Sequence, residues 1–542
     1  MPVEFPLCAG VAPPRRPPRN HEATMSGVDY GIIAGYAGLL ILIGARAGRG
    51  HQIESEFTLG ARSMPTWAVL CSMTATELSA ATFIGVPHAA YTGDWSYLQL
   101  AVGALLAKAV LARYVIPLYR KLGLVTVYGF LQDRFGSVTQ RSAAVCFLGG
   151  RLLASGARLF IAALALSAVT NVPVLWAVVS CGLVAGFYTV AGGIRAVIWT
   201  DTVQAALLFT GALAILFVLA NAGPQSLTSI TDWAEASERT QIFHLTPLFS
   251  LTDGRALGTA LVGAFFLTLA THSTDHDMVQ RLLTTRSTTG GSSALLGSAL
   301  LNFPMTLIFL LIGTGLAHFY ATPPDYSIED HARILPIFAL HELPSGLRGL
   351  LFTGLFAAAM SSLDSAICAL ATTWTHDIRP PASGRSNPLR RVQLSSLAFT
   401  LLLIAAALAM AKYHALLTNR GTSLNLVEFA LSSMTILYGG LLGIFALGVT
   451  TRSRGSRAST VAGLIAGGAV GLALFLHPIV LQRTWVAWTW WVPISASIAF
   501  SVAWTGRTAR AFEAPKSDYS SANHERQLPQ DQTSPEQEST RT

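Results

Sequence analysis

A column of hydroxyl groups stands inside one of the most apolar stretches of the chain, between about residues 347 and 375. Ala358, Ser361, Ser362 and Ser365 are spaced i, i+3, i+4 and i+7, so they share one face of a helix. Hydrocarbon offers hydroxyls no partner, so this face should point at a cavity, an ion or another helix. With Asp364 beside them, the three serines suggest a site for a small cation.

The elements that position this face belong to an all-α polytopic membrane protein. Of 542 residues, 52% are hydrophobic and 12% are charged, against about 25% charged in soluble domains. Apolar runs of the roughly 20 residues that cross a bilayer occur about thirteen times. They are centred near Gly38, Ser79, Leu106, Phe160, Leu183, Thr210, Leu267, Leu307, Leu363, Leu403, Leu437, Ala469 and Ile494.

These spans predict one membrane domain over residues 25–511, with no room for a soluble catalytic domain. Residues 1–24 are rich in Pro and Arg and lack the apolar core of a signal peptide. Residues 512–542 are polar, with Ser, Gln, Glu and Pro. We expect both ends to be disordered and the tail to be cytoplasmic.

The basic residues of the short loops predict the orientation. They follow the first, third, ninth and eleventh spans, and they are Arg46, Arg49, Arg62, Arg120, Lys121, Arg134, Arg141, Arg379, Arg385, Arg390, Arg391, Arg452, Arg454 and Arg457. All these loops lie on one side, so that side should be cytoplasmic and the N-terminus outside, in a multi-pass protein of the plasma (inner) membrane. The net charge of +8 then reflects the excess of basic residues in the loops on one side of the membrane and indicates no nucleic-acid partner.

Two spans look broken. The second carries many hydroxyls around Ser79 and ends on Gly85 and Pro87, and the seventh runs from Leu267 to Asp277 through further polar residues. An unwound midpoint frees carbonyls and amides that can hold a substrate and a cation, as in many secondary transporters. The two spans lie five apart, as expected for two inverted repeats of five helices, which favours a transporter over helices that merely tolerate polar residues.

Several ordered motifs resemble those of the sodium–solute symporters, the family of sodium/glucose, sodium/proline and sialic acid transporters. They occupy residues 57–65, 76–87, 192–204, 277–281, and 357–365 together with 375–378. The resemblance implies an inverted five-plus-five repeat with broken first and sixth core helices. It also implies no enzymatic activity but sodium-coupled import of a small organic solute by alternating access, by a chain that functions as a monomer.

The resemblance implies a main sodium site where the first and eighth core helices meet. Its ligands would be the backbone carbonyls of Ala75 and Leu78, together with Ala358, Ser361 and Ser362. A dehydrated hard cation needs about five or more oxygens, and neutral dipoles suffice if they converge. The alternative is that the two serines are small residues of a helix-packing surface.

A second sodium site, found in some members, would use Asp201 of the fifth core helix with Ser361, Asp364 and Ser365. The family often has Ser or Thr where this chain has Asp364. This added carboxylate could strengthen cation binding, or it could titrate. The alternative for Asp201 is a solvated ion pair with Arg195 at the inner membrane edge.

The candidate solute-binding residues are Ser79, Thr82, Gln99, Arg158, Thr268 and Thr271. Ser79 and Thr82 resemble the pair in sialic acid transporters, whereas galactose carriers have an amide at the position of Thr82. Arg158 lies seven residues after Arg151, roughly 10 Å deeper along one helix face. A guanidinium there could clamp a carboxylate, as the matching arginine does in sialic acid transporters, or it could snorkel or pair with Glu77. We therefore favour a carboxylate-bearing solute over a sugar, proline or another amino acid.

Other classes of protein remain open at this point. His272 and His276, with Asp275 and Asp277, could suggest a metal-dependent enzyme, but Ser273 stands where the zinc-protease motif needs Glu. No Lys follows a Gly, which excludes a P-loop and direct ATP drive. The short tail leaves no signalling domain for a sensor. Coupling to protons instead of sodium would change the ion but not the class.

Overall fold

The structure, a computed structural model, describes residues 25–49, 53–170, 172–221, 227–321, 334–380, 387–418, 426–481 and 483–507. The expected disordered segments 1–24 and 512–542 lie outside these ranges. The described residues form helices and no strand, which confirms the all-α class. The helices are α1 Gly27–Gly48, α2 Glu54–Leu59, α3 Thr66–Glu77, α4 Ala80–Thr92, α5 Tyr97–Val110, α6 Ile116–Lys121, α7 Tyr128–Phe135, α8 Ser137–Thr170, α9 Val174–Ala220, α10 Leu227–Ala236, α11 Leu257–Ser273, α12 His276–Leu283, α13 Thr288–Phe319, α14 Ile334–Glu342, α15 Leu347–Thr373, α16 Pro388–Thr418, α17 Leu426–Thr450, α18 Arg457–Leu481 and α19 Trp491–Trp504.

The helices have the length and composition of membrane spans. Within the described ranges, eight are long and apolar enough to cross a bilayer, and two bent pairs, α3 with α4 and α11 with α12, meet the same criteria together. Helix α9 has 47 residues, about 70 Å of helix, more than twice the hydrocarbon thickness. It therefore corresponds to the two spans predicted near Leu183 and Thr210. The total of thirteen stays a prediction.

A glycine divides α9 into its two halves. Gly193 has φ +54° and ψ −152°, a backbone conformation that residues with a Cβ rarely adopt. A Cβ at this position would also lie 2.5 Å from the carbonyl oxygen of Phe57. Both constraints require Gly here, so the bend in α9 and its contact with α2 depend on this residue.

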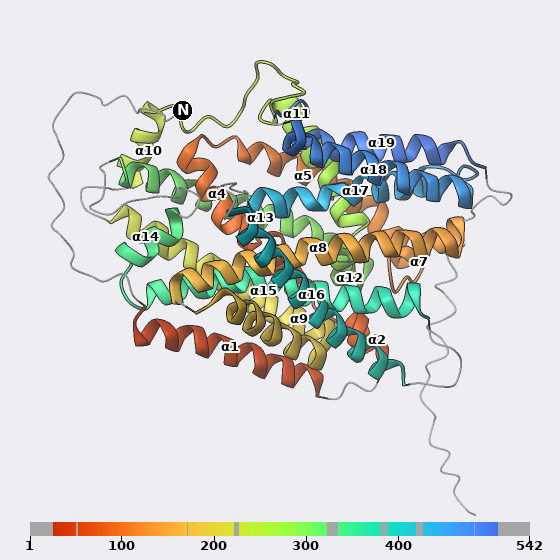
Figure 1. Ribbon diagram of the computed structural model, residues 1–542, viewed down its shortest axis with the longest axis horizontal. Helices are drawn as coiled ribbons and strands as arrows, with labels where there is room; N and C mark the ends of the chain where they lie inside the picture. The colour runs from red at the N-terminus through yellow and green to blue at the C-terminus, as the bar shows by residue number, and fades with distance from the viewer. Residues whose placement is uncertain are drawn as a thin grey trace, which may run out of the picture.

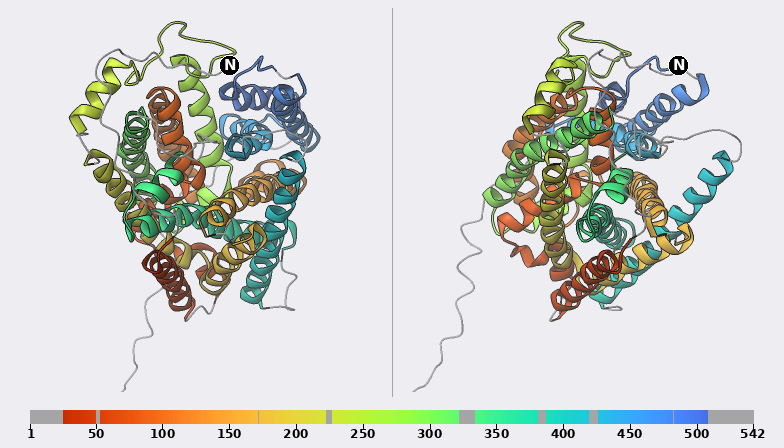
Figure 2. Two further views of the ribbon diagram at one scale, coloured as in Figure 1. Left: turned by 60° about the vertical axis from the view of Figure 1, so that its left-hand side comes forward. Right: turned by 90° about the vertical axis from the view of Figure 1, so that its left-hand side faces the viewer.

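The long helices run along the longest axis of the molecule, with α1 at one edge and α17, α18 and α19 together near the opposite edge (Figure 1). Helix α15 crosses the interior, where α9, α8, α1 and α16 pack around it (Figure 2). Its most apolar 18-residue window is completely buried, unlike that of any other membrane-capable helix in the described ranges. The hydroxyl face of α15 therefore faces protein and not lipid.

Both predicted breaks are present. Helices α3 and α4 meet at 56°, and α11 and α12 meet at 62°. The first break lies at Leu78 and Ser79, and α4 continues through Pro87 to Thr92. The prediction that this span ends on Gly85 and Pro87 is therefore wrong. Pro87 is tolerated because it stands in the second half of a helix that has already restarted at Ala80.

The arginine-bearing loops gather at one end of the bundle. Arg62 donates to the carbonyl of Gly123 at 3.1 Å, which joins the loops after the first and third spans. Arg134 donates to the carbonyl of Arg454 at 3.1 Å, which joins the loops after the third and eleventh spans. The loops after the first, third and eleventh spans thus share one end, as predicted, and we expect that end to be cytoplasmic.

Candidate functional site

The hydroxyl face of α15 lies against the break between α3 and α4. The hydroxyls of Thr76 and Ser361 are 3.0 Å apart and both residues are buried. Ser362 Oγ donates to the carbonyl of Ala358 at 3.5 Å, and Ser365 Oγ donates to that of Ser361 at 2.7 Å. The structure thus brings the two halves of the predicted main sodium site next to each other.

The break supplies the other half of the oxygens. Helix α3 ends at Glu77, and Ser79 has an extended backbone with ψ 167°. The carbonyls in the last turn of α3 consequently lose the amide donors that a continuous helix would provide. Ala75 and Leu78, the predicted carbonyl ligands, are 0% and 4% exposed. Partial negative charge therefore collects at a dry helix end that faces α15.

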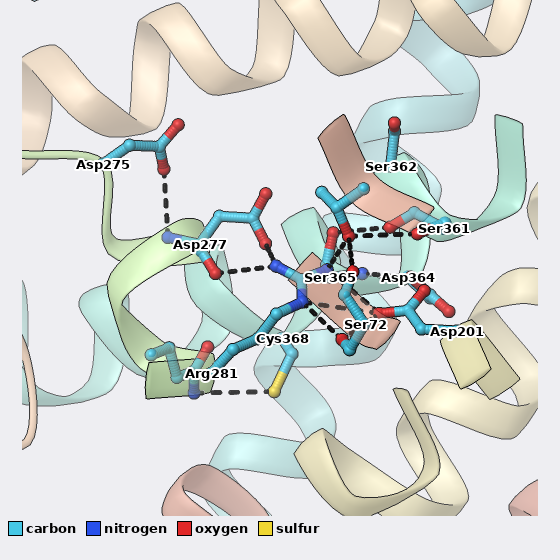
Figure 3. A network of polar contacts seen from close by, with 12 residues as sticks. Ser72, Asp201, Asp275, Asp277, Arg281, Ser361, Ser362, Asp364, Ser365 and Cys368 are labelled. Atoms are coloured by element: carbon cyan, nitrogen blue, oxygen red, sulfur yellow. Dashed lines mark hydrogen bonds and ion pairs between the residues drawn. The ribbon is translucent and has the colours of Figure 1, made fainter. Parts of the chain in front are cut away.

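Arg281 of α12 connects this region to two further helices (Figure 3). Its Nη2 donates to Thr76 Oγ1 at 2.6 Å, and its Nε donates to Ser72 Oγ at 2.9 Å. Its Nη2 also lies 3.3 Å from Asp201 Oδ2, and its Nη1 lies 2.8 Å from Asp277 Oδ1. One buried guanidinium thus holds α3 and α9 against α12.

The predicted second sodium site surrounds this arginine. Asp201 is fully buried and accepts from Ser72 and Arg281, so the alternative of a solvated pair with Arg195 is wrong. Its other oxygen, Oδ1, is buried and has no hydrogen-bond partner within the described residues. Asp364 of α15 lies close to Asp201 (Figure 3). Its Oδ2 accepts a hydrogen bond from Tyr188 at 2.8 Å.

Carboxylates outnumber guanidinium groups in this region. Asp275 and Asp277, at the break between α11 and α12, both accept from Arg151 of α8. Four buried carboxylates (Asp201, Asp275, Asp277 and Asp364) therefore face three arginines (Arg151, Arg158 and Arg281). A cation bound among these carboxylates would offset part of their buried negative charge.

Four of the candidate solute residues lie on the helices that form the two breaks. At the start of α4, the hydroxyl oxygens of Ser79 and Thr82 are 3.4 Å apart. Thr271 on α11 donates to the carbonyl of Leu267 at 3.0 Å. Thr268 is 8% exposed on the same helix.

Gln99 and Arg158 lie on the neighbouring helices. Gln99 of α5 is fully buried and donates to the carbonyl of Arg255 at 3.0 Å, next to the start of α11. Arg158 is 8% exposed, which excludes a snorkelling side chain in lipid, and the role of partner to Glu77 belongs to Lys108, 2.6 Å away. A role for Gln99 or Arg158 in solute binding stays a prediction.

The sequence reasoning missed several residues that organise the site. They are Ser72, Thr76, Lys108, Tyr188 and Arg281. Lys108 carried a usable signal, because it is a charged residue inside a predicted span. For Ser72, Thr76 and Tyr188, only the three-dimensional neighbours distinguish a structural hydroxyl from a functional one.

The histidines near the second break do not form a metal site. His272 contacts Glu77 at 3.2 Å. Within the described residues, no group of three or more His, Cys, Asp or Glu side chains is placed to hold a metal ion.

The sequence model of the sodium:solute symporter family matches residues 57–467, well over half of the chain. The chain belongs to this family. It is 28% identical to the sodium/sialic acid symporter of Aliivibrio fischeri, over 81% of this chain and 86% of that one. It is 27% identical to the human sodium-coupled monocarboxylate transporter 1, over 84% of this chain and 75% of that one.

The fold agrees with the family. A solved outward-open, substrate-bound structure of a Na⁺-coupled sialic acid symporter superposes with a TM-score of 0.79 at 24% identity, covering 89% of this chain and 99% of that one. The described fold is therefore the fold of that transporter. This symporter is a multi-pass membrane protein whose coupling ion is sodium.

Proposed function

We propose that this symporter imports a small carboxylate-bearing solute with sodium by alternating access, across the plasma membrane and as a monomer. One observation carries the proposal: the serine face of α15 meets the break of α3 and α4, where Thr76 and Ser361 are 3.0 Å apart. Sodium bound there would join two helices that must separate when the inner side opens. Sodium occupancy would therefore favour the outward-open state and order the solute site.

The main sodium site of the proposal uses neutral oxygens only. The carbonyls of Ala75, Leu78 and Ala358 and the hydroxyls of Ser361 and Ser362 are five oxygens, a sufficient set for a hard cation. The residues fit this role because all five are buried by 96% or more. The neighbouring Asp201, with an unbonded oxygen, and the side chains of Ser361, Asp364 and Ser365 would hold a second sodium.

The preference for a carboxylate comes from Arg158 and from the relatives. Arg158 lies on the same face of α8 as Arg151, whose guanidinium reaches the break between α11 and α12. A guanidinium near a helix break can bind a carboxylate in bidentate fashion. Two relatives of this chain are named as transporters of sialic acid and of monocarboxylates, and both kinds of solute bear a carboxylate.

Uptake into proteoliposomes tests the sodium site. The double variant Ser361→Ala/Ser362→Ala removes two of five oxygens without adding volume, so we expect sodium-driven uptake to fall by at least about a hundredfold. The probes are radiolabelled N-acetylneuraminate, pyruvate, proline and glucose, each with an inward gradient of sodium or of potassium.

The matched control is Ser292→Ala, which removes a hydroxyl of α13 that donates to the carbonyl of Ala112 at 2.7 Å. Unchanged sodium-driven uptake by the double variant would rule out the assigned site. Uptake driven by a proton gradient without sodium would replace sodium by protons in the proposal.

A further inference from the structure

An ion pair between buried Lys108 and partly buried Glu77 lies beside the proposed main sodium site. Glu77 is the last residue of α3 and stands between the carbonyl ligands proposed at Ala75 and Leu78. Lys108 of α5 donates to its Oε1 at 2.8 Å and to its Oε2 at 2.6 Å. The Lys108 side chain is 2% exposed, so this ammonium lies inside the protein.

Three more side chains complete the cluster around Glu77. Asn302 of α13 donates to Glu77 Oε2 at 2.6 Å, and Ser298, one turn earlier, donates to Oε1 at 3.2 Å. His272 of α11 lies 3.2 Å from the same Oε1. Lys108 gives its remaining hydrogen bond to Ser298 at 2.9 Å. The carboxylate and the ammonium thus use their full bonding capacity within the cluster.

This saturation decides what Glu77 can do. Four side chains already contact this carboxylate and Lys108 donates to both of its oxygens, so it is not free to bind sodium, although its backbone lies between two proposed ligands. Its charge also lies at the C-terminus of α3, where the helix dipole disfavours an anion. Neither helix stability nor sodium coordination therefore accounts for an acidic residue here. Its bonds to three other helices do account for it.

The end of α3 needs such an anchor. At the break, α3 loses amide donors that would continue it into α4, so its last carbonyls depend more on tertiary contacts than those of a continuous helix. Glu77 is bonded to α5, α11 and α13, and these contacts hold the last turn of α3. Thr76 makes the corresponding contact with Ser361 of α15.

We propose that Glu77 and Lys108 are positioning residues for sodium: the ion pair fixes the last turn of α3 so that the carbonyls of Ala75 and Leu78 face Ser361 and Ser362. The pair does not touch the ion. Its contribution is the preorganisation of two backbone ligands, which lowers the ordering cost of sodium binding. This inference rests on the proposed sodium site.

A charge-neutral double variant separates positioning from electrostatics. Glu77→Gln/Lys108→Met removes both charges together, so the net charge near the sodium site does not change. The amide of Gln keeps hydrogen bonds but loses the ammonium. Sodium affinity is measured on purified protein, as the sodium concentration that gives half of the sodium-dependent rise in melting temperature at constant ionic strength.

We expect sodium affinity about tenfold weaker than in the unchanged protein, with the melting temperature in potassium nearly unchanged. Asp94→Asn/His244→Gln is the control, because it replaces another carboxylate–base pair, partly exposed and 2.9 Å apart, on the loops at the opposite end. Its sodium affinity should stay unchanged.

Unchanged or tighter sodium binding in the double variant would overturn the proposal. If the double variant does not fold, Asn302→Ala removes one donor to Glu77 and keeps both charges, and it should weaken sodium binding about threefold. Unchanged affinity in that variant overturns the proposal equally. A wild-type protein with no sodium-dependent stabilisation would instead contradict the proposed function itself.

Discussion

At the scale of single residues, the site combines neutral oxygens with a network of buried charges. The proposed main sodium ligands carry no formal charge, whereas Arg281 and Asp201 form an ion pair 3.3 Å apart just beside them. A buried charge is stable only when it is paired and hydrogen-bonded, and the pairs here connect different helices. The same side chains that balance charge therefore also position the oxygens.

Arg158 is the residue whose replacement should discriminate between solutes. Loss of a charge-assisted bidentate contact costs about 1.5–3 kcal/mol, so Arg158→Ala should raise the KM for an acidic solute by about 10- to 100-fold. Neutral solutes should be affected several-fold less. The measurement is a comparison of uptake of N-acetylneuraminate and pyruvate with that of proline and glucose.

Arg141→Ala is the control, because Arg141 is exposed at the start of the same helix. Equal losses for acidic and neutral solutes would assign Arg158 to the structure and not to the solute.

At the scale of elements, two broken helices supply backbone groups to the candidate site and one unbroken helix supplies side chains. Helices α3/α4 and α11/α12 open their backbones at the breaks, and α15 stays helical from Leu347 to Thr373 and presents its side chains. An unbroken helix can hold a column of hydroxyls in register, since its backbone groups bond to one another. The position of α15 along its axis then decides whether those hydroxyls meet the break.

Asp29 of α1 holds the N-terminal end of α15 in place. Its Oδ1 accepts from the backbone amides of Gly346 and Gly349, both at 2.8 Å, and its Oδ2 accepts from Ser26. The carboxylate thus satisfies orphan amides at the N-terminus of α15 and interacts favourably with its dipole. We expect Asp29→Ala to cost about 1–3 kcal/mol of stability.

The melting temperature in detergent checks this expectation. Asp253→Ala is the control, because Asp253 is exposed and its pair with Arg255 is 3.5 Å long. A variant at Asp29 that melts like the control would show that α15 is anchored elsewhere.

At the scale of the whole molecule, the two ends of the bundle differ in their contacts. The arginine-bearing loops meet at one end, and residues 91–96 meet residues 239–244 at the other. In this second group, His244 lies 2.9 Å from Asp94, and the backbone amide of Trp95 donates to Gln241. The sorting of loops by charge is thus built into the fold.

Reporter fusions test the orientation in a bacterial host. With thirteen spans and the basic loops inside, green fluorescent protein fused after Thr542 should fluoresce, and alkaline phosphatase fused there should be inactive. Alkaline phosphatase inserted after Glu238, in the expected outer loop, should be active. The reverse pattern at Thr542 would mean an even number of spans or the opposite orientation.

The sequence could predict the features that depend on composition and spacing. The α-helical membrane class, the broken spans around Ser79 and Asp275, and the serine face of α15 follow from hydropathy and from a period of 3.6 residues. The exact end of the first broken helix could not be predicted. Pro87 suggests a stop, but a proline is tolerated within a membrane helix when neighbouring groups satisfy the freed backbone.

The sequence alone therefore determined the α-helical membrane class, the family and the kinds of side chain at the candidate site. What only the tertiary structure decided is which charges meet: Asp201 with Arg281, Arg151 with Asp275, and Glu77 with Lys108 and not with Arg158. The physical reason is that the apolar and polar faces of each helix follow from its own local sequence. A buried charge, in contrast, is satisfied by whichever helices pack around it, and in these three pairs that packing brings together residues up to 124 positions apart.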